Sequence, residues 1–156
     1  MCFIWLVGVI CAALFLLGLV VWADVACQNF LNAFITDHLG ATNYYYRLFT
    51  NNVTPGTATV LTDFTEATFT GYAAIQGNAI TWPAASLAAH VAQSTGSNIT
   101  FNNTSGSPVT VYGVYVTDGA TATKLYFAER DTNAPVSIPA GGSYVYTPNQ
   151  QFKSIN

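Results

Sequence analysis

The chain has 156 residues, of which only 7% are charged, and its net charge is −3 at pH 7. Ordinary soluble proteins carry roughly 25% charged residues. A nucleic-acid site needs several basic side chains that converge on the phosphates, and the four present are scattered, so we expect no nucleic-acid partner. They are Arg47, Lys124, Arg130 and Lys153. A weakly charged surface of Thr, Asn, Ser, Gln and Gly favours packing against other subunits.

The three cysteines all lie near the N-terminus, at Cys2, Cys11 and Cys27. Their absence from the remaining sequence excludes a disulfide framework there and argues against a cysteine-based metal site. Cys2 and Cys11 fall within an apolar segment, where we interpret them as small apolar side chains.

Residues 3–22 form an apolar run of 20 residues, and the first 22 residues carry no charge. A helix needs roughly 20 residues to cross the hydrocarbon core of a bilayer. Three interpretations of this leader, residues 1–23, stay open. It is a retained membrane anchor, a cleaved signal peptide, or an upstream extension of a reading frame whose translation begins near Val20 or Val21.

Each of the first two interpretations has one feature in its favour and one against it. A signal peptide would be cleaved acceptably after Ala23, but no basic residue precedes Arg47 to form its charged start. An anchor fits the length of the run, but no Lys or Arg flanks it to set an orientation.

Residues 24–40 are expected to form an amphipathic helical segment, with the helix itself running from Asp24 to Leu39. Asp24 is suited to cap its N-terminus, and Gly40 is suited to end it in the left-handed conformation. His38 falls in the last turn, where a basic residue suits the helix dipole. The apolar residues recur at helical spacing: Cys27, Phe30, Leu31, Phe34, Ile35 and Leu39.

From residue 43 onward the pattern indicates short β-strands separated by turn residues. Residues 43–50 are rich in aromatic side chains that favour strands. Residues 109–117 carry apolar side chains on both faces, which predicts a central strand buried on both sides, and 123–130 should return as its hairpin partner. We expect further strands at 71–75, 79–82, 98–101, 136–138 and 143–146, and a short helical turn or a loop at 84–93.

Seven or eight short strands with turn signals roughly every 8–12 residues are typical of an antiparallel sandwich. The predicted fold class is therefore mainly β. Residues 41–156 should form a single antiparallel β-sandwich, Ig-like or jelly-roll-like, preceded by the amphipathic helix and by an N-terminal hydrophobic helix.

The sequence shows no catalytic, cofactor-binding or metal-binding constellation. Asp37 and His38 are adjacent, but no nucleophile is identifiable nearby, and His90 stands alone. Glycosidase chemistry needs two carboxylates that face each other across a cleft, and nothing in the sequence brings such a pair together. The carboxylates of the β region that could pair are Asp63, Glu66, Glu129 and Asp131. Arg130 can pair with an acidic neighbour. We expect no catalytic residue, no cofactor and no metal, and so a protein that is not an enzyme.

Tyrosines offer the one pattern with a bearing on carbohydrate. They could serve as platforms on which sugars stack, but their alternation along strands favours packing in a core or an interface. These residues are Tyr44, Tyr45, Tyr46, Tyr112, Tyr115, Tyr126, Tyr144 and Tyr146. Asn52, Asn98, Asn102 and Asn103 match the N-glycosylation pattern, which a chain rich in Asn and Thr produces by chance.

Several segments recur in a set order that is similar to a known pattern. They are LFTNNVTP at 48–55, FTEA at 64–67, GYA at 71–73, Trp82, VYGVYVTD at 111–118 and FAER at 127–130. This order resembles a family of small, poorly characterised tailed-phage virion proteins, over roughly residues 25–148. Members of that family generally begin at the helix, so the apolar leader is a departure that favours the upstream extension.

The resemblance implies a non-enzymatic virion structural protein, located on the capsid surface or in the tail. Its partners would be other virion proteins and further copies of itself. The leader supports an alternative, an exported domain that is secreted or tethered to a membrane through residues 3–22. Such a domain would bind carbohydrate or protein at a cell surface.

Overall fold

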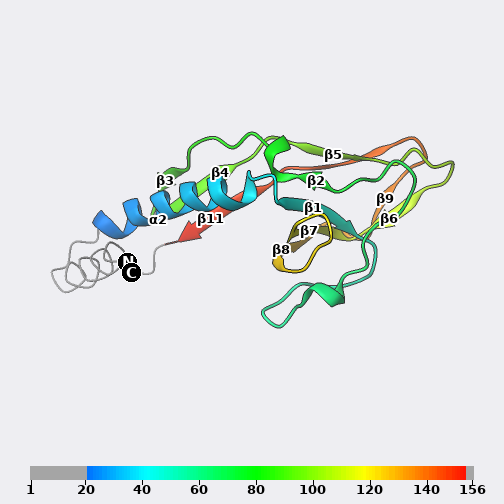
Figure 1. The fold of residues 1–156 in the computed structure, drawn as a ribbon, viewed down its shortest axis with the longest axis horizontal. Coiled ribbons are helices and arrows are strands. Elements are labelled where there is room, and N and C mark those ends of the chain that lie inside the picture. The colour runs from blue at the N-terminus through cyan, green and yellow to red at the C-terminus, as the bar shows by residue number, and fades with distance from the viewer. Residues whose placement is uncertain (1–20, 154–156) are drawn as a thin grey trace. The chain divides into compact units, whose positions relative to one another are not determined.

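The computed structural model describes residues 21–153. Cys2, Cys11 and the predicted leader, apart from its last three residues, lie outside this part of the chain. Within it, no helix has both the length and the apolar character needed to cross a membrane. The described chain is mainly β, with eleven short strands and one α-helix, and its sheets are antiparallel where their pairing is defined (Figure 1).

Two compact units make up the described chain, and they alternate along the sequence. Unit 1 contains residues 21–33, 84–94 and 149–153, and unit 2 contains residues 34–83 and 95–148.

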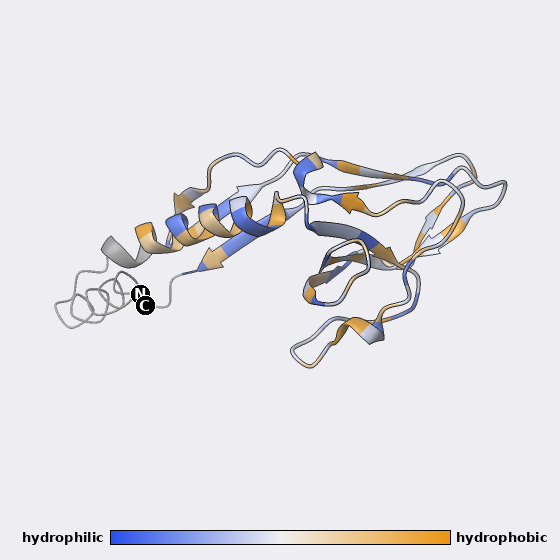
Figure 2. Ribbon diagram, viewed as in Figure 1, coloured by the Kyte–Doolittle hydropathy of each residue, from blue (hydrophilic) through white to orange (hydrophobic). Residues whose placement is uncertain are grey.

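Unit 1 combines the helix α2 (Val21–Phe34) with a three-stranded sheet. The strand order is β11 (Asn149–Lys153), β4 (Val91–Thr95), β3 (Ser86–Ala88). Polar and apolar residues alternate around the helix (Figure 2), and Leu31 on it is fully buried. Two helix side chains bind the backbone of Ala85: Gln28 Nε2 donates to its carbonyl at 2.5 Å, and Asn32 Oδ1 accepts from its N–H at 2.8 Å.

The helix predicted over 24–39 is present and the helical segment ends at Leu39 as predicted, but the predicted capping is wrong at both ends. Asp24 lies inside α2 and is not its N-cap, because the described helix already includes residues 21–23. At the other end the chain passes into a π-helical turn, Ile35–Leu39, and Gly40 has φ −95°, which is not left-handed. The Gly40 N–H reaches five residues back to the Ile35 carbonyl at 2.8 Å, so the wider turn itself satisfies the terminal groups.

The segment 84–93, expected to be a helical turn or a loop, is a β-hairpin instead. Strands β3 and β4 pair with Ala88 opposite Val91, which leaves a loop of two residues. These residues, Ala89 and His90, have φ of +48° and +66°. Two-residue loops with positive φ at both positions usually contain Asn-Gly or Asp-Gly, and Ala-His gives no such signal in the sequence.

The largest sheet of unit 2 has four strands. Its order is β2 (Ile75–Gln76), β1 (Tyr44–Phe49), β7 (Gly113–Asp118), β8 (Leu125–Arg130). The predicted strands at 43–50 and 123–130 are thereby confirmed.

The strand predicted at 109–117 is interrupted at Tyr112. Residues 113–117 are buried on both faces, as predicted. The preceding part is a separate strand, β6 (Val109–Val111), which pairs with β9 (Val136–Ile138). A hydrophobicity pattern cannot show this change of partner, since apolar side chains continue through both pieces.

A two-stranded sheet of β5 (Ile99–Asn102) and β10 (Ser143–Tyr146) completes unit 2. The predictions at 98–101, 136–138 and 143–146 are confirmed. Those at 71–75 and 79–82 are wrong, because only β2 is a strand there and a 3-10 turn, Gly77–Ala79, follows it. A second 3-10 turn lies at Leu61–Asp63.

The hydrophobic core of unit 2 takes side chains from all of these sheets. Its fully buried members include Tyr46 and Leu48 of β1, Val114 and Val116 of β7, and Phe101 of β5. Opposite pairing places Tyr46 beside Val116 and Leu48 beside Val114, so these four side chains share one face of the four-stranded sheet.

Candidate functional site

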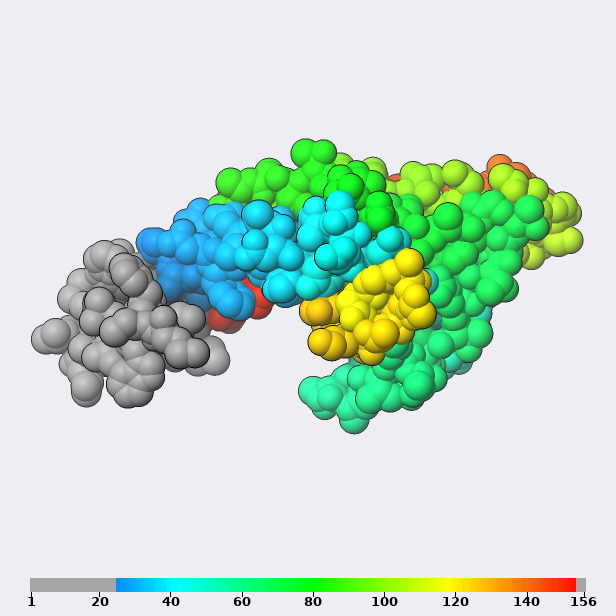
Figure 3. Space-filling model, in the orientation of Figure 1, coloured from blue at the N-terminus to red at the C-terminus, as the bar shows by residue number. Residues whose placement is uncertain are grey.

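The acid–histidine pair at the helix end forms contacts inside unit 2. Asp37 is exposed, whereas His38 Nδ1 lies 2.5 Å from the Tyr44 hydroxyl, which in turn contacts the Tyr126 hydroxyl at 3.3 Å. The hydrogen bond with Tyr126, together with burial, raises the pKa of Tyr44 to about 12. Nearby, a turn begins at Gly119 (yellow in Figure 3), and the Gly119 N–H donates a hydrogen bond to the Asn43 carbonyl.

His90 lies elsewhere, exposed at the tip of the unit 1 hairpin.

Arg47 is a buried cation at the centre of a polar network in unit 2. Its Nη1 donates to both Glu66 oxygens at 2.7 Å, and its Nε donates to Thr117 Oγ1 at 3.0 Å. Its Nη2 donates to the Ala120 carbonyl at 2.6 Å. Such pairing is what allows a charge to be buried at all. The network joins β1, β7, the turn after β7 and the loop that carries Glu66.

Glu66 also binds Tyr72, which extends the network. The Tyr72 hydroxyl donates to Glu66 Oε1 at 2.9 Å and accepts from the Leu48 N–H at 3.2 Å. Burial, followed by the Glu66 charge, raises the pKa of Tyr72 well above its usual range. Beside the network, the rings of Phe64 and Tyr115 stack with centroids 5.0 Å apart. The hydrogen bonds that Glu66 accepts from Arg47 and Tyr72 thus hold its loop against the sheet.

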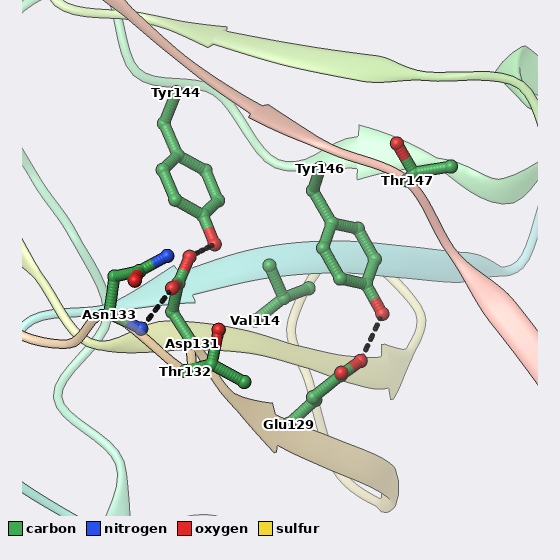
Figure 4. A pocket seen from close by; sticks show the side chains of 8 residues that line it. All are labelled: Val114, Glu129, Asp131, Thr132, Asn133, Tyr144, Tyr146 and Thr147. Atoms are coloured by element: carbon green, nitrogen blue, oxygen red, sulfur yellow. Dashed lines mark hydrogen bonds between the residues drawn. The ribbon is translucent and has the colours of Figure 1, made fainter.

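The structure brings two of the four candidate carboxylates together, at a pocket in unit 2 (Figure 4). Glu129 lies on β8 and Asp131 directly after it. Tyr146 on β10 donates its hydroxyl to Glu129 Oε2 at 2.8 Å, and Tyr144 donates to Asp131 Oδ2 at 2.6 Å. Two parallel tyrosine–carboxylate pairs therefore link β10 to the end of β8.

Burial is the main cause that raises the pKa of both tyrosines far above the usual range. The hydrogen bond to Asp131 is the next cause for Tyr144, and the charge of Glu129 is the next for Tyr146. Both hydroxyls therefore stay protonated and act as donors. Because a carboxylate that already accepts a short hydrogen bond is held in one orientation, the pocket has a fixed polar wall.

The pocket has a volume of about 240 Å³ and is lined mainly by polar side chains. Its other members are Val114, Thr132, Asn133 and Thr147. The Asn133 backbone N–H donates to Asp131 Oδ1 at 2.8 Å, and Thr147 Oγ1 donates to Asn98 Oδ1 at 2.6 Å. Asp63, the remaining candidate carboxylate, accepts from the Val60 N–H and is not part of the pocket.

Sequence reasoning named Glu129 and Asp131 among the carboxylates that could pair and missed their tyrosine partners. The signal is the spacing: two acids two residues apart and two tyrosines two residues apart each present one face of an extended chain. Sequence alone does not reveal that those two faces meet. The predicted pairing of Arg130 with an acidic neighbour is wrong, since Arg130 Nη1 donates to the Val53 carbonyl at 2.9 Å and its guanidinium lies 5.1 Å from the centre of the Tyr112 ring.

The predicted glycosylation patterns differ in accessibility. Asn103 is fully buried, and its amide donates to the carbonyls of Ser107, Ile138 and Pro139, so it is not open to modification. Asn52, Asn98 and Asn102 are exposed.

Among residues 21–153 no group of three or more His, Cys, Asp or Glu side chains is arranged to hold a metal ion. Comparisons with protein-family models, with curated proteins and with solved structures find no match to this chain.

Proposed function

We propose that this chain is a non-enzymatic structural component of a tailed-phage particle, on the capsid surface or in the tail, that acts through contacts with other virion proteins and with further copies of itself. The segments that resemble the virion family motivate the proposal. The observation that carries it is that residues of those segments bind one another within unit 2.

The residues of the family pattern bind one another. Glu66 of FTEA and Tyr72 of GYA are hydrogen-bonded to each other, and Glu66 also pairs with Arg47 next to LFTNNVTP. Thr117 of VYGVYVTD binds the same guanidinium. Their polar groups are used to hold a loop on a sheet, so a role in maintaining the fold accounts for the pattern without any substrate.

We further propose that the strands of unit 2 form a single antiparallel sandwich of the Ig-like or jelly-roll-like kind. Two sheets with a shared core support this arrangement. Tyr46, Leu48 and Val116 of the four-stranded sheet belong to the same buried cluster as Phe101 and Tyr144 of the two-stranded sheet. A sandwich with few charges suits a subunit that is repeated many times in an assembly.

The test is to find the chain in particles. Phage particles produced by cells that carry the gene are purified on a density gradient and analysed by quantitative mass spectrometry. The proposal expects the chain to co-migrate with the major capsid protein in a fixed ratio, after a high-salt wash that removes adsorbed proteins. A host protein of similar abundance serves as the control for contamination.

Two outcomes would contradict the proposal. One is absence of the chain from washed particles. The other is its recovery in the membrane pellet after a carbonate wash, which would favour the exported, membrane-tethered domain.

A further inference from the structure

The pocket of Glu129, Asp131, Tyr144 and Tyr146 has polar groups that the fold does not use. Glu129 is exposed, and within the described chain no group donates to its second oxygen, Oε1. The exposed side chains of Thr132 and Asn133 at the same pocket also form no hydrogen bond to the described residues. One acceptor and two groups that both donate and accept therefore line its wall.

The chemistry of the lining restricts what can bind. Two carboxylates and no basic side chain disfavour an anion. The predominance of polar side chains, with Val114 as the one aliphatic member, disfavours an apolar ligand. A volume of about 240 Å³ is below the roughly 300–1,000 Å³ of drug-sized sites, so the ligand is small.

A metal ion fits this wall poorly. Asp131 uses one oxygen for the Tyr144 hydroxyl and the other for the Asn133 N–H, and Glu129 uses one oxygen for Tyr146. Calcium takes six to eight oxygen ligands, several of them carboxylates. Hydroxyl groups, in contrast, need only single acceptors that are already oriented.

We propose that this pocket binds a single neutral sugar residue, whose hydroxyls donate to Glu129 Oε1 and exchange hydrogen bonds with Thr132 and Asn133. The two tyrosines hold the carboxylates in place before the ligand arrives, which lowers the entropic cost of binding. This inference is independent of assembly into a particle: a particle component can lack the sugar site, and a sugar-binding chain can be absent from particles.

The probe is a set of methyl glycosides of glucose, galactose, mannose, rhamnose and N-acetylglucosamine. Each is titrated to about 50 mM into the 15N-labelled full chain, kept in a detergent without a sugar headgroup, and binding is followed by NMR. For a ligand of this size we expect a Kd on the order of 1 mM for at least one glycoside. The shifted amide signals should belong to residues 129–133 and 144–147.

Two substitutions test the wall. Glu129→Gln replaces the charged acceptor by a neutral one and should weaken binding about tenfold, and Thr132→Ala should weaken it by a smaller factor. Thr132 is exposed, and the amide oxygen introduced by Glu129→Gln can still accept the Tyr146 hydroxyl, so the fold should persist, as unchanged signals from β1 and β7 would show. The matched control is Thr110→Ala, an exposed threonine on β6 away from the pocket, which should leave the Kd unchanged.

The proposal is overturned if none of the five glycosides shifts these signals. It is also overturned if Glu129→Gln leaves the Kd unchanged, or if Thr110→Ala weakens binding as much as Thr132→Ala does. Calcium chloride at about 1 mM that shifts the same signals, with no response to any glycoside, would show a cation site instead.

Discussion

At the scale of single residues, unit 2 contains a buried cation, Arg47, whose guanidinium donors all have partners within the fold. Arg47 is 6% exposed, yet its guanidinium binds a carboxylate, a hydroxyl and backbone carbonyls. A buried charge of this kind is costly when it loses its partner, because the remaining group stays desolvated. The contribution of Arg47 is therefore best measured through its removal.

We predict that Arg47→Met lowers the free energy of unfolding by about 2–4 kcal/mol, since it leaves Glu66 and two carbonyls without their donor. Glu66 is partly exposed, with 32% of its side chain accessible, so water compensates in part for the lost donor. Urea denaturation of the full chain measures the change. Lys124→Met is the control, an exposed lysine that should alter stability by less than about 0.5 kcal/mol. Equal effects of the two substitutions would contradict the prediction.

Sequence reasoning named Arg47 among the basic residues and Glu66 among the carboxylates of the β region, without relating the two. It could not pair them, because the two residues come together through a loop whose path follows from many weak turn signals. The burial of several tyrosines was predicted correctly from their alternation along strands. They are Tyr46, Tyr115, Tyr144 and Tyr146. Alternation reports which face a side chain occupies, whereas the identity of its partner depends on the topology.

At the scale of elements, close approaches of backbone decide where strands begin. A Cβ atom on Gly113 would overlap the Glu129 carbonyl and lie 2.9 Å from the Phe49 ring. Glycine is therefore required at the first residue of β7, directly after the break at Tyr112. The run 109–117 was predicted as one strand because its hydrophobicity is continuous. The geometric requirement at Gly113, which produces the break, leaves no trace in a hydrophobicity pattern.

We predict that Gly113→Ala lowers the free energy of unfolding by about 3 kcal/mol or more, because β8 must move away from β7 to admit the methyl group. Gly106→Ala is the matched control, since a Cβ atom there meets nothing within 4 Å. Thermal unfolding of both variants checks this. A Gly113→Ala protein as stable as the Gly106→Ala protein would refute the close approach.

The hairpin of unit 1 offers a change in the stabilising direction. Ala89 has φ +48°, a conformation that asparagine tolerates better than alanine does. We predict that Ala89→Asn stabilises the β3–β4 pair by about 0.5–1 kcal/mol. Slower hydrogen exchange of the Val91 and Gln93 amides, which face β3, would show this, with Ala88→Asn in the neighbouring strand as the control. Faster exchange in Ala89→Asn would contradict the prediction.

At the scale of the whole molecule, the many buried tyrosines link stability to alkaline pH. The pKa of Tyr44 and that of Tyr115 are each raised to about 12, mainly by the Tyr126 hydrogen bond in the first case and by burial in the second. An unfolded tyrosine ionises near pH 10. Between these values the unfolded chain releases protons that the folded chain retains, so unfolding becomes more favourable as the pH rises.

We predict that the free energy of unfolding is unaffected by these tyrosines below about pH 9 and falls between about pH 10 and 12. The slope should be about 1.4 kcal/mol per pH unit for each tyrosine involved. Urea denaturation at a series of pH values measures it, and Tyr115→Phe should reduce the slope by one tyrosine's share. A flat profile up to pH 12 would contradict the prediction.

The predominance of β structure was predictable from the sequence because strands and turns alternate at short intervals from residue 43 onward. The division into two units was not. The strands β3, β4 and β11 are short, and their hairpin lacks the usual turn residues, so nothing in their pattern separates them from the strands of unit 2.

The interleaved arrangement of unit 1 has a consequence for synthesis on the ribosome. Its sheet places β4 between β3 and β11, and β11 is encoded long after the other two. During translation one edge of β4 therefore stays unpaired until residues 149–153 have emerged from the ribosome. A nascent chain should acquire the order of unit 2 first, and a stop codon before residue 149 should release a polypeptide whose middle strand is left as an open, aggregation-prone edge.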